Sequence, residues 1–132
     1  MICLDTSFII DLINAKTKAL DILSKWQDEV ICTTRINIFE VLVGIFLRKG
    51  KLSPAFPEKA KNFMENLSIL ELDEVSAIKA AKIKGDLLSQ GREIETTDCL
   101  IAGIMLANHC MRIITRNNSH FERIPGLEVL SY

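Results

Sequence analysis

Short apolar runs alternate along the chain with longer segments in which apolar residues recur every three or four positions. The runs are too short for buried helices and predict β-strands. They are Ile2 to Leu4, Val30 to Cys32, Leu67 to Leu72, Arg112 to Thr115 and Leu127 to Leu130. Strands that alternate with helices are typical of a mainly parallel sheet covered on both faces. We therefore expect an α/β fold with four or five strands, formed as a single domain by residues 1–132.

Residues that favour helix caps mark where several helices should begin. The expected caps are Thr33 or Thr34, Asp73, and Thr96 or Thr97. The first of these helices is expected to run to about Lys49, where Gly50 ends it. The second carries apolar or small residues on one face, at Val75, Ile78, Ala81, Gly85 and Leu88. A face of this kind is typical of a helix that packs on a core.

Residues that follow a strand are the first candidates for a site, because reactive groups gather at the carboxyl ends of parallel strands. Asp5 directly follows the first predicted strand, and Asn117 follows the fourth. Asp is also a favoured helix cap, and a carboxylate in this place can cap a helix and bind a metal at once. Asn is by default a loop residue here, although its amide oxygen can contact a metal ion or its water.

Glu40 lies in a segment, Ile36 to Phe46, that is apolar on almost every side. Such a helix is expected to be buried, and Glu is almost never fully buried unless it pairs with or coordinates a cation. An ionised, unpaired carboxylate there would be strongly unfavourable, so either its pKa rises or it meets a cation. The alternatives are that Glu40 occupies a single polar stripe, or that it pairs with Arg35 or Arg48.

Asp98 repeats this pattern in the first turn of another nearly apolar helix. The helix dipole favours a carboxylate there by about 0.3–1 kcal/mol, which is an alternative explanation. Two carboxylates about 5 Å apart repel by about 3 kcal/mol at an effective dielectric of about 20, so three at neighbouring strand ends require a cation. Oxygen ligands suit Mg²⁺ or Mn²⁺. These acids therefore predict metal-assisted hydrolysis of a phosphodiester.

Composition excludes several other classes of protein. A net charge of −1 lacks the basic excess of proteins that coat nucleic acid, but it allows an enzyme that holds a few phosphates at a metal. The four cysteines form no Cys-x-x-Cys pair and are expected to be small buried residues, and His109 and His120 have no companions at metal-binding spacing. With no apolar run long enough for a membrane span and no secretory signal at its start, the protein is expected in the cytoplasm.

Four segments together resemble the PIN-domain ribonucleases, and the compact length resembles the VapC-type toxins of toxin–antitoxin pairs. The segments are Leu4 to Ser7, Phe39 to Gly44, Asp98 to Ala102 and Ile114 to Phe121. The resemblance implies a three-layer α/β/α sandwich whose central strand comes first in sequence. It also implies an endoribonuclease that depends on Mg²⁺ or Mn²⁺, acts on RNA as a homodimer, and is silenced by a small antitoxin protein.

The resemblance also assigns roles to individual residues. Asp5, Glu40 and Asp98 match the acidic positions of the family, which bind the metal. Asn117 completes the expected catalytic set, at a position where many members carry a fourth acid and others carry Asn. Contacts to water or phosphate are expected from Thr6, Ser7, Thr115 and Asn118.

Two other functions stay open on the sequence alone. A regulatory α/β module of the phospho-acceptor receiver type would need a second acid beside Asp5 and a Lys after the last strand, and the sequence has neither. A PIN-like scaffold that binds RNA or protein without cutting it is the other alternative, and only Asn117 favours it.

Overall fold

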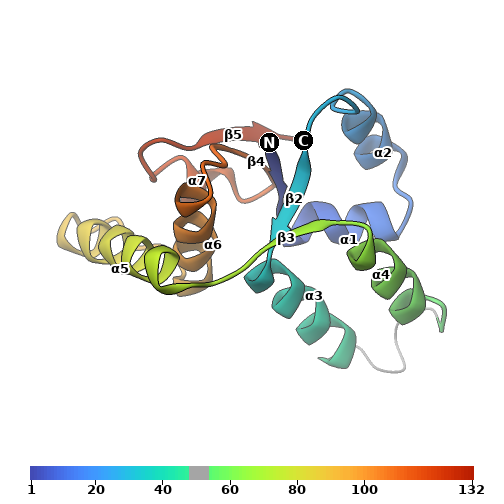
Figure 1. The fold of residues 1–132 in the computed structure, drawn as a ribbon, viewed down its shortest axis with the longest axis horizontal. Helices are drawn as coiled ribbons and strands as arrows, with labels where there is room; N and C mark the ends of the chain where they lie inside the picture. Colours follow the sequence, from blue (N-terminus) through green and yellow to red (C-terminus); the bar gives the residue numbers. More distant parts are fainter. Residues whose placement is uncertain (48–53) are drawn as a thin grey trace.

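Five parallel strands form one sheet in the computed structural model, which describes residues 1–47 and 54–132. The strands are β1 (Ile2–Leu4), β2 (Ile31–Thr34), β3 (Ser68–Leu70), β4 (Arg112–Thr115) and β5 (Glu128–Ser131). Their order in the sheet is β3-β2-β1-β4-β5, and each neighbouring pair is parallel (Figure 1). The predicted parallel α/β fold is confirmed, with shifts of one or two residues at the ends of β2, β3 and β5.

Helices cover the sheet on both faces and connect its strands (Figure 1). They are α1 (Thr6–Ile13), α2 (Thr17–Ser24), α3 (Arg35–Leu47), α4 (Phe56–Glu65), α5 (Glu74–Ser89), α6 (Thr96–Ala107) and α7 (Asn118–Phe121). The predicted end of the third helix, at Lys49 and Gly50, lies outside the described residues. The short helix α7 is not expected from the sequence.

The central strand β1 is fully buried, and its side chains alternate between two apolar cores. Cys3 belongs to the core beneath α5 and α6, together with Ile113 of β4. Leu4 belongs to the core beneath α1, together with Ile114. Because neighbouring residues of one strand serve opposite cores, the fold is the expected three-layer sandwich.

Two of the predicted helix caps are present. Asp73 accepts a hydrogen bond from the N–H of Ser76 at 2.8 Å, and the Ser76 hydroxyl accepts one from the N–H of Asp73 at 2.7 Å. Thr34 accepts a hydrogen bond from the N–H of Asn37 at 3.2 Å, at the start of α3. These caps fix where α5 and α3 leave the sheet.

The predicted cap of α6 is wrong by one or two residues. Glu95 holds the cap position in an extended conformation, with φ −61° and ψ 148°, and its side chain makes no cap hydrogen bond. Thr96 and Thr97 are instead the first two residues of the helix.

Helices α5 and α6 approach each other closely at Gly103. A Cβ atom at this position would lie 2.6 Å from the Cβ of Ala80, 2.6 Å from the carbonyl oxygen of Ser76 and 2.7 Å from the nitrogen of Ala80. Only Gly fits between these atoms, two of which belong to the backbone. The contact fixes α6, and therefore Asp98 in its first turn, against α5.

Two apolar helix faces that the sequence predicts to be buried lie on the surface. Helix α3 exposes Phe39, Leu42, Phe46 and Leu47, with Phe46 74% exposed. Helix α5 exposes Val75, Ile78 and Leu88 of its predicted core face, with Ile78 63% exposed. Helix α5 instead packs on α6 through its opposite face, where Ser76 and Ala80 are small enough to allow the close approach. The apolar pattern therefore marks a second surface and not the core.

The cysteines and the helix lengths agree with the expectations from composition. All four cysteines are free and buried, so they are packing residues. Within residues 1–47 and 54–132, no helix is both long enough and apolar enough to span a bilayer.

Candidate active site

The residues that the sequence singles out meet where β1, β2 and β4 end. Asp5 follows β1 directly, Thr115 is the last residue of β4, and Glu40 lies in the helix that follows β2. Because the three strands are neighbours and parallel, their carboxyl ends open at one edge of the sheet. The site lies at this edge.

Asp5 is buried, and three side chains donate hydrogen bonds to its carboxylate. Thr115 and Ser7 donate to Oδ2 at 2.7 and 3.0 Å, and the Asn37 amide donates to Oδ1 at 3.1 Å. Asp5 does occupy the cap position of α1, but its carboxylate accepts no hydrogen bond from the helix backbone. Capping therefore does not account for the place of this carboxylate.

Asn37 is a site residue that the sequence reasoning missed. It is 0% exposed, and its amide nitrogen donates to Asp5 Oδ1 and to the Thr6 hydroxyl, each at 3.1 Å. Its amide oxygen accepts from the hydroxyl of Thr34 at 2.6 Å and from the N–H of Thr34 at 3.3 Å. A polar amide three residues before Glu40, on the same side of an apolar helix, is the signal that identifies it.

Glu40 is half-buried and held by a hydroxyl group. The Thr6 hydroxyl donates to Oε2 of Glu40, and Thr97, in the first turn of α6, lowers the pKa of the same carboxyl. Thr6 in turn accepts from Asn37, so one chain of hydrogen bonds links Glu40 to Asp5. Burial raises the pKa of Glu40 above its usual range, and the neighbouring charges of Asp5 and Asp98 add to the effect.

Glu40 is not neutralised by an ion pair with Arg35. The Arg35 guanidinium binds Glu71 instead, with Nε 3.0 Å from Oε2. The other alternative partner, Arg48, lies outside the described residues. The expectation that the whole Glu40 helix is buried is also wrong, since this helix is exposed on one side.

Asp98 is buried in the first turn of α6, and two side chains converge on its Oδ2 atom. The Asn117 amide nitrogen donates at 3.1 Å, and Nδ1 of His120 lies 2.6 Å away. Burial raises the pKa of Asp98 above its usual range, and the hydrogen bond from His120 offsets part of this effect. His120 is a second site residue that the sequence reasoning missed, because only its spacing to other metal ligands was considered.

The residues expected to assist are placed unevenly. Thr6, Ser7 and Thr115 all donate to the carboxylates, and the backbone N–H of Asn117 donates to Thr115 at 2.9 Å. Asn118 starts α7, and its buried amide oxygen accepts no hydrogen bond within the described part of the chain. Unlike the three hydroxyl residues, it makes no hydrogen bond there to Asp5, Glu40 or Asp98.

Asp11, a buried acid outside the site, is neutralised by basic side chains, whereas the three acids of the site are not, within the part of the chain that the structure describes. Asp11 is buried in α1 and is neutralised by Lys16, at 2.7 Å, and by Arg116. Among residues 1–47 and 54–132, no Lys or Arg forms an ion pair with Asp5, Glu40 or Asp98. The negative charge at the carboxyl edge is therefore held by hydroxyl, amide and imidazole donors alone.

The donor set at this edge fits a hard divalent cation. Its acids present only oxygen atoms, which suit Mg²⁺ or Mn²⁺. Across the described ranges, no three His, Cys, Asp or Glu side chains are already gathered closely enough to hold an ion. Hydrogen-bond donors hold the carboxylates instead. The three acids still lie near enough that the charge of Asp5 helps to raise the pKa of both Glu40 and Asp98. The site therefore fits a divalent cation in the type of its ligand atoms and in its negative charge.

Asp98→Asn is expected to raise the melting temperature in the presence of a chelator. Burial raises the pKa of Asp98, so the ionised form destabilises the folded protein and Asn removes that effect. The gain is greatest at neutral pH and disappears as the pH falls through the raised pKa toward the ordinary value of 3.8. Thermal melts of both proteins between pH 4 and about 8 measure it. A clear drop in melting temperature at neutral pH would instead make Asp98 a stabilising helix-start residue.

The family model described as "PIN domain" matches residues 2–127. The chain belongs to the PIN domain family.

The individual relatives are bacterial proteins of the VapC group. A tRNA(fMet)-specific endonuclease VapC of Shigella flexneri is 25% identical over 124 residues, which cover 94% of this chain and 92% of that protein. Ribonuclease VapC2 of Haemophilus influenzae is 28% identical over 130 residues, and the match covers 94% of this chain and 92% of that protein.

Solved structures agree in fold. A chain of VapBC2 from Rickettsia felis, bound to promoter DNA, has a TM-score of 0.87 at 24% identity and covers 100% of this chain and 99% of that one. A chain of DNA-bound VapBC from Salmonella typhimurium has a TM-score of 0.78 at 27% identity, with 98% and 96% covered.

Proposed function

We propose that the chain is a single-domain endoribonuclease that depends on Mg²⁺ or Mn²⁺, and that it is the toxin of a toxin–antitoxin pair in the cytoplasm. One observation carries the proposal: three acids converge at one edge of the sheet, and no Lys or Arg among the described residues neutralises them. The names of the VapC relatives support RNA as the substrate.

Asp5, Glu40 and Asp98 would hold the ion. A bound Mg²⁺ or Mn²⁺ supplies positive charge that activates water and offsets the charge that develops on the phosphodiester. Thr115 and Ser7 orient the Asp5 carboxylate by donating to Oδ2.

The test is cleavage of a labelled RNA pool that includes tRNA, with Mg²⁺, with Mn²⁺ and with chelator. Internal cleavage that requires a divalent ion is expected. RNA binding without cleavage, with either ion present, would contradict the proposal and favour the scaffold alternative.

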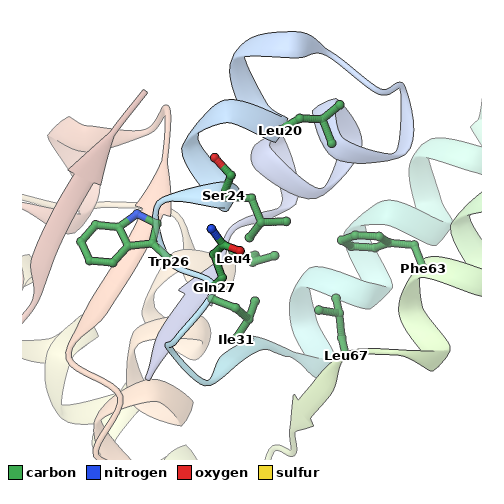
Figure 2. A pocket seen from close by; sticks show the side chains of 9 residues that line it. Leu4, Leu20, Ser24, Trp26, Gln27, Ile31, Phe63 and Leu67 are labelled. Carbon is green, nitrogen blue, oxygen red and sulfur yellow. The ribbon is translucent and has the colours of Figure 1, made fainter.

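An apolar cavity of about 410 Å³ between α2 and α4 is the proposed seat of an antitoxin side chain. Its lining is almost wholly apolar: Leu4, Leu20, Leu23, Trp26, Ile31, Phe63 and Leu67, with Ser24 and Gln27 at one side. Phe63 and Leu67 lie across the cavity from Ser24 and Gln27 (Figure 2). Apolar hollows of this kind suit one or two anchoring side chains of a partner protein. That the similar structures are VapBC complexes supports an antitoxin as the occupant.

A gene directly upstream that encodes a small DNA-binding protein would supply the partner for the test. Its product is expected to co-purify with this chain and to change the fluorescence of Trp26, the single Trp. Leu20→Glu, which alters an exposed wall residue of the cavity, is expected to weaken the complex, whereas Met111→Glu is not. If wild type, Leu20→Glu and Met111→Glu all bind the partner equally well, the partner does not use this cavity.

The exposed apolar faces of α3 and α5 are proposed to bind a second copy of the chain. Both helices pack on α6, and each turns several large apolar side chains to the surface. Groups of exposed large apolar side chains favour burial against a partner. A homodimer would bury them with the same residues on both sides.

Ile78→Lys is expected to shift the protein from dimer toward monomer, because a Lys on the α5 face places a charge in the proposed contact. Light scattering after size exclusion distinguishes the two states, since one chain has a mass of 14.9 kDa. Val30→Lys, at an equally exposed apolar residue before β2, serves as the matched control. A monomeric wild-type chain would contradict the homodimer.

A further inference from the structure

His120 reaches the site from α7, the short helix that follows β4. Phe121, the next residue, is fully buried in the core and anchors this helix. His120 itself is partly exposed, and its Nδ1 atom lies 2.6 Å from Oδ2 of Asp98. The imidazole ring is therefore held beside the carboxylate by the packing of its neighbour.

The geometry gives this contact one direction. We assign the proton of this contact to Nδ1 of His120, because an ionised carboxylate oxygen only accepts; Nδ1 also lies 2.8 Å from the amide nitrogen of Asn117, whose own hydrogen bond goes to Asp98. Asn117 donates to the same oxygen at 3.1 Å. Oδ1 of Asp98 accepts no hydrogen bond from a side chain within residues 1–47 and 54–132. Both contacts thus involve one oxygen of Asp98 and leave the other without a side-chain donor among the described residues.

We propose that His120 is a positioning residue, which fixes Oδ2 of Asp98 through its Nδ1–H group so that Oδ1 is presented to the metal ion. The inference rests on the proposed metal-dependent function. Donors behind a metal ligand set its orientation, and their removal typically weakens metal affinity or activity by about 10–100-fold. His120 acts through Asp98 and needs no contact with RNA or metal.

Three substitutions separate this role from others. Asn places an amide nitrogen close to the position of Nδ1, whereas Gln places it nearer to that of Nε2. Ala removes both donors. We expect Mn²⁺ to bind His120→Asn within about threefold of wild type, and His120→Ala and His120→Gln at least about tenfold more weakly.

Titration calorimetry with Mn²⁺ at a fixed pH measures the dissociation constants without any RNA. Cleavage assays at saturating Mn²⁺ are expected to restore most of the kcat of the weakened variants. His109→Asn is the matched control: His109 is exposed, and its backbone φ of 55° is one that Asn tolerates. Thermal melts establish that each variant folds, and if His120→Ala does not, the Asn and Gln pair decides the comparison.

Two outcomes would overturn the inference. His120→Asn that binds Mn²⁺ as weakly as His120→Gln would show that the Nδ1 donor is not what matters. Unchanged Mn²⁺ affinity in His120→Gln, with cleavage lost, would make His120 act on the RNA directly. The proposed function can fail separately from this inference. That outcome would be Mn²⁺ affinities in the expected order for wild type and the His120 variants, together with no RNA cleavage by the wild-type chain.

Discussion

Glu40→Gln is expected to lower the rate of RNA cleavage by at least about 10²–10³-fold, the loss typical when one group that stabilises transition-state charge is removed. Gln has nearly the same shape and can still accept the hydrogen bond from Thr6, so the fold should survive. What it lacks is the negative charge that attracts a divalent ion. Asp5→Asn and Asp98→Asn are expected to have the same effect.

Single-turnover cleavage of a labelled RNA at saturating Mg²⁺ or Mn²⁺ measures the loss. Glu71→Gln provides the matched control, because Glu71 is exposed and pairs with Arg35, and neither residue bonds to Asp5, Glu40 or Asp98 within the described ranges. Activity of Glu40→Gln close to that of Glu71→Gln, in metal-controlled buffer, would remove Glu40 from the catalytic set.

Gly103→Ala is expected to destabilise the protein by about 2–3 kcal/mol, in the upper part of the range for overpacking. The added Cβ would meet the backbone of Ser76 and Ala80 at 2.6 and 2.7 Å, and backbone atoms cannot turn away as a side chain can. Helices α5 and α6 would have to separate. The higher helix propensity of Ala returns only about 1 kcal/mol.

Urea denaturation measures this change, and the chain holds its own control. Gly85 lies in α5, and a Cβ atom added there would have nothing within 4 Å, so Gly85→Ala is expected to stabilise by about 0.5–1 kcal/mol. Adding Ala80→Gly to Gly103→Ala should recover only part of the loss, because the clash with backbone remains. Equal stability of Gly103→Ala and wild type would mean that the two helices slide apart freely.

The parallel α/β fold and the carboxyl-edge site follow from patterns that sequence displays well. Ile2 to Leu4 is apolar throughout because β1 is covered on both faces, and an acid directly after such a strand falls at the edge of the sheet. Asp5, Thr115 and Asn117 could therefore be placed near one another from the sequence alone.

The hydrophobic pattern of the sequence does not reveal which element each helix face packs against. The apolar stripe at Val75, Ile78 and Leu88 has the same periodicity whether it faces the core, a second chain or water. The true contact face of α5 uses Ser76 and Ala80, small residues that hydrophobicity alone does not distinguish. Asn37 and His120 were missed for a related reason, since their importance depends on which carboxylate each one reaches.

The hydrogen bond between Thr115 and Asp5 joins residues 110 positions apart, and this has a consequence for protein synthesis. Strand β1 leaves the ribosome first, yet it gains its second neighbour only when β4 has been made. Pairing over such a separation is slow compared with local helix formation. A growing chain that ends before β4 therefore carries all three acids in order, but it lacks the strand that brings Thr115 beside Asp5, so the proposed site can form only after β4 has been made.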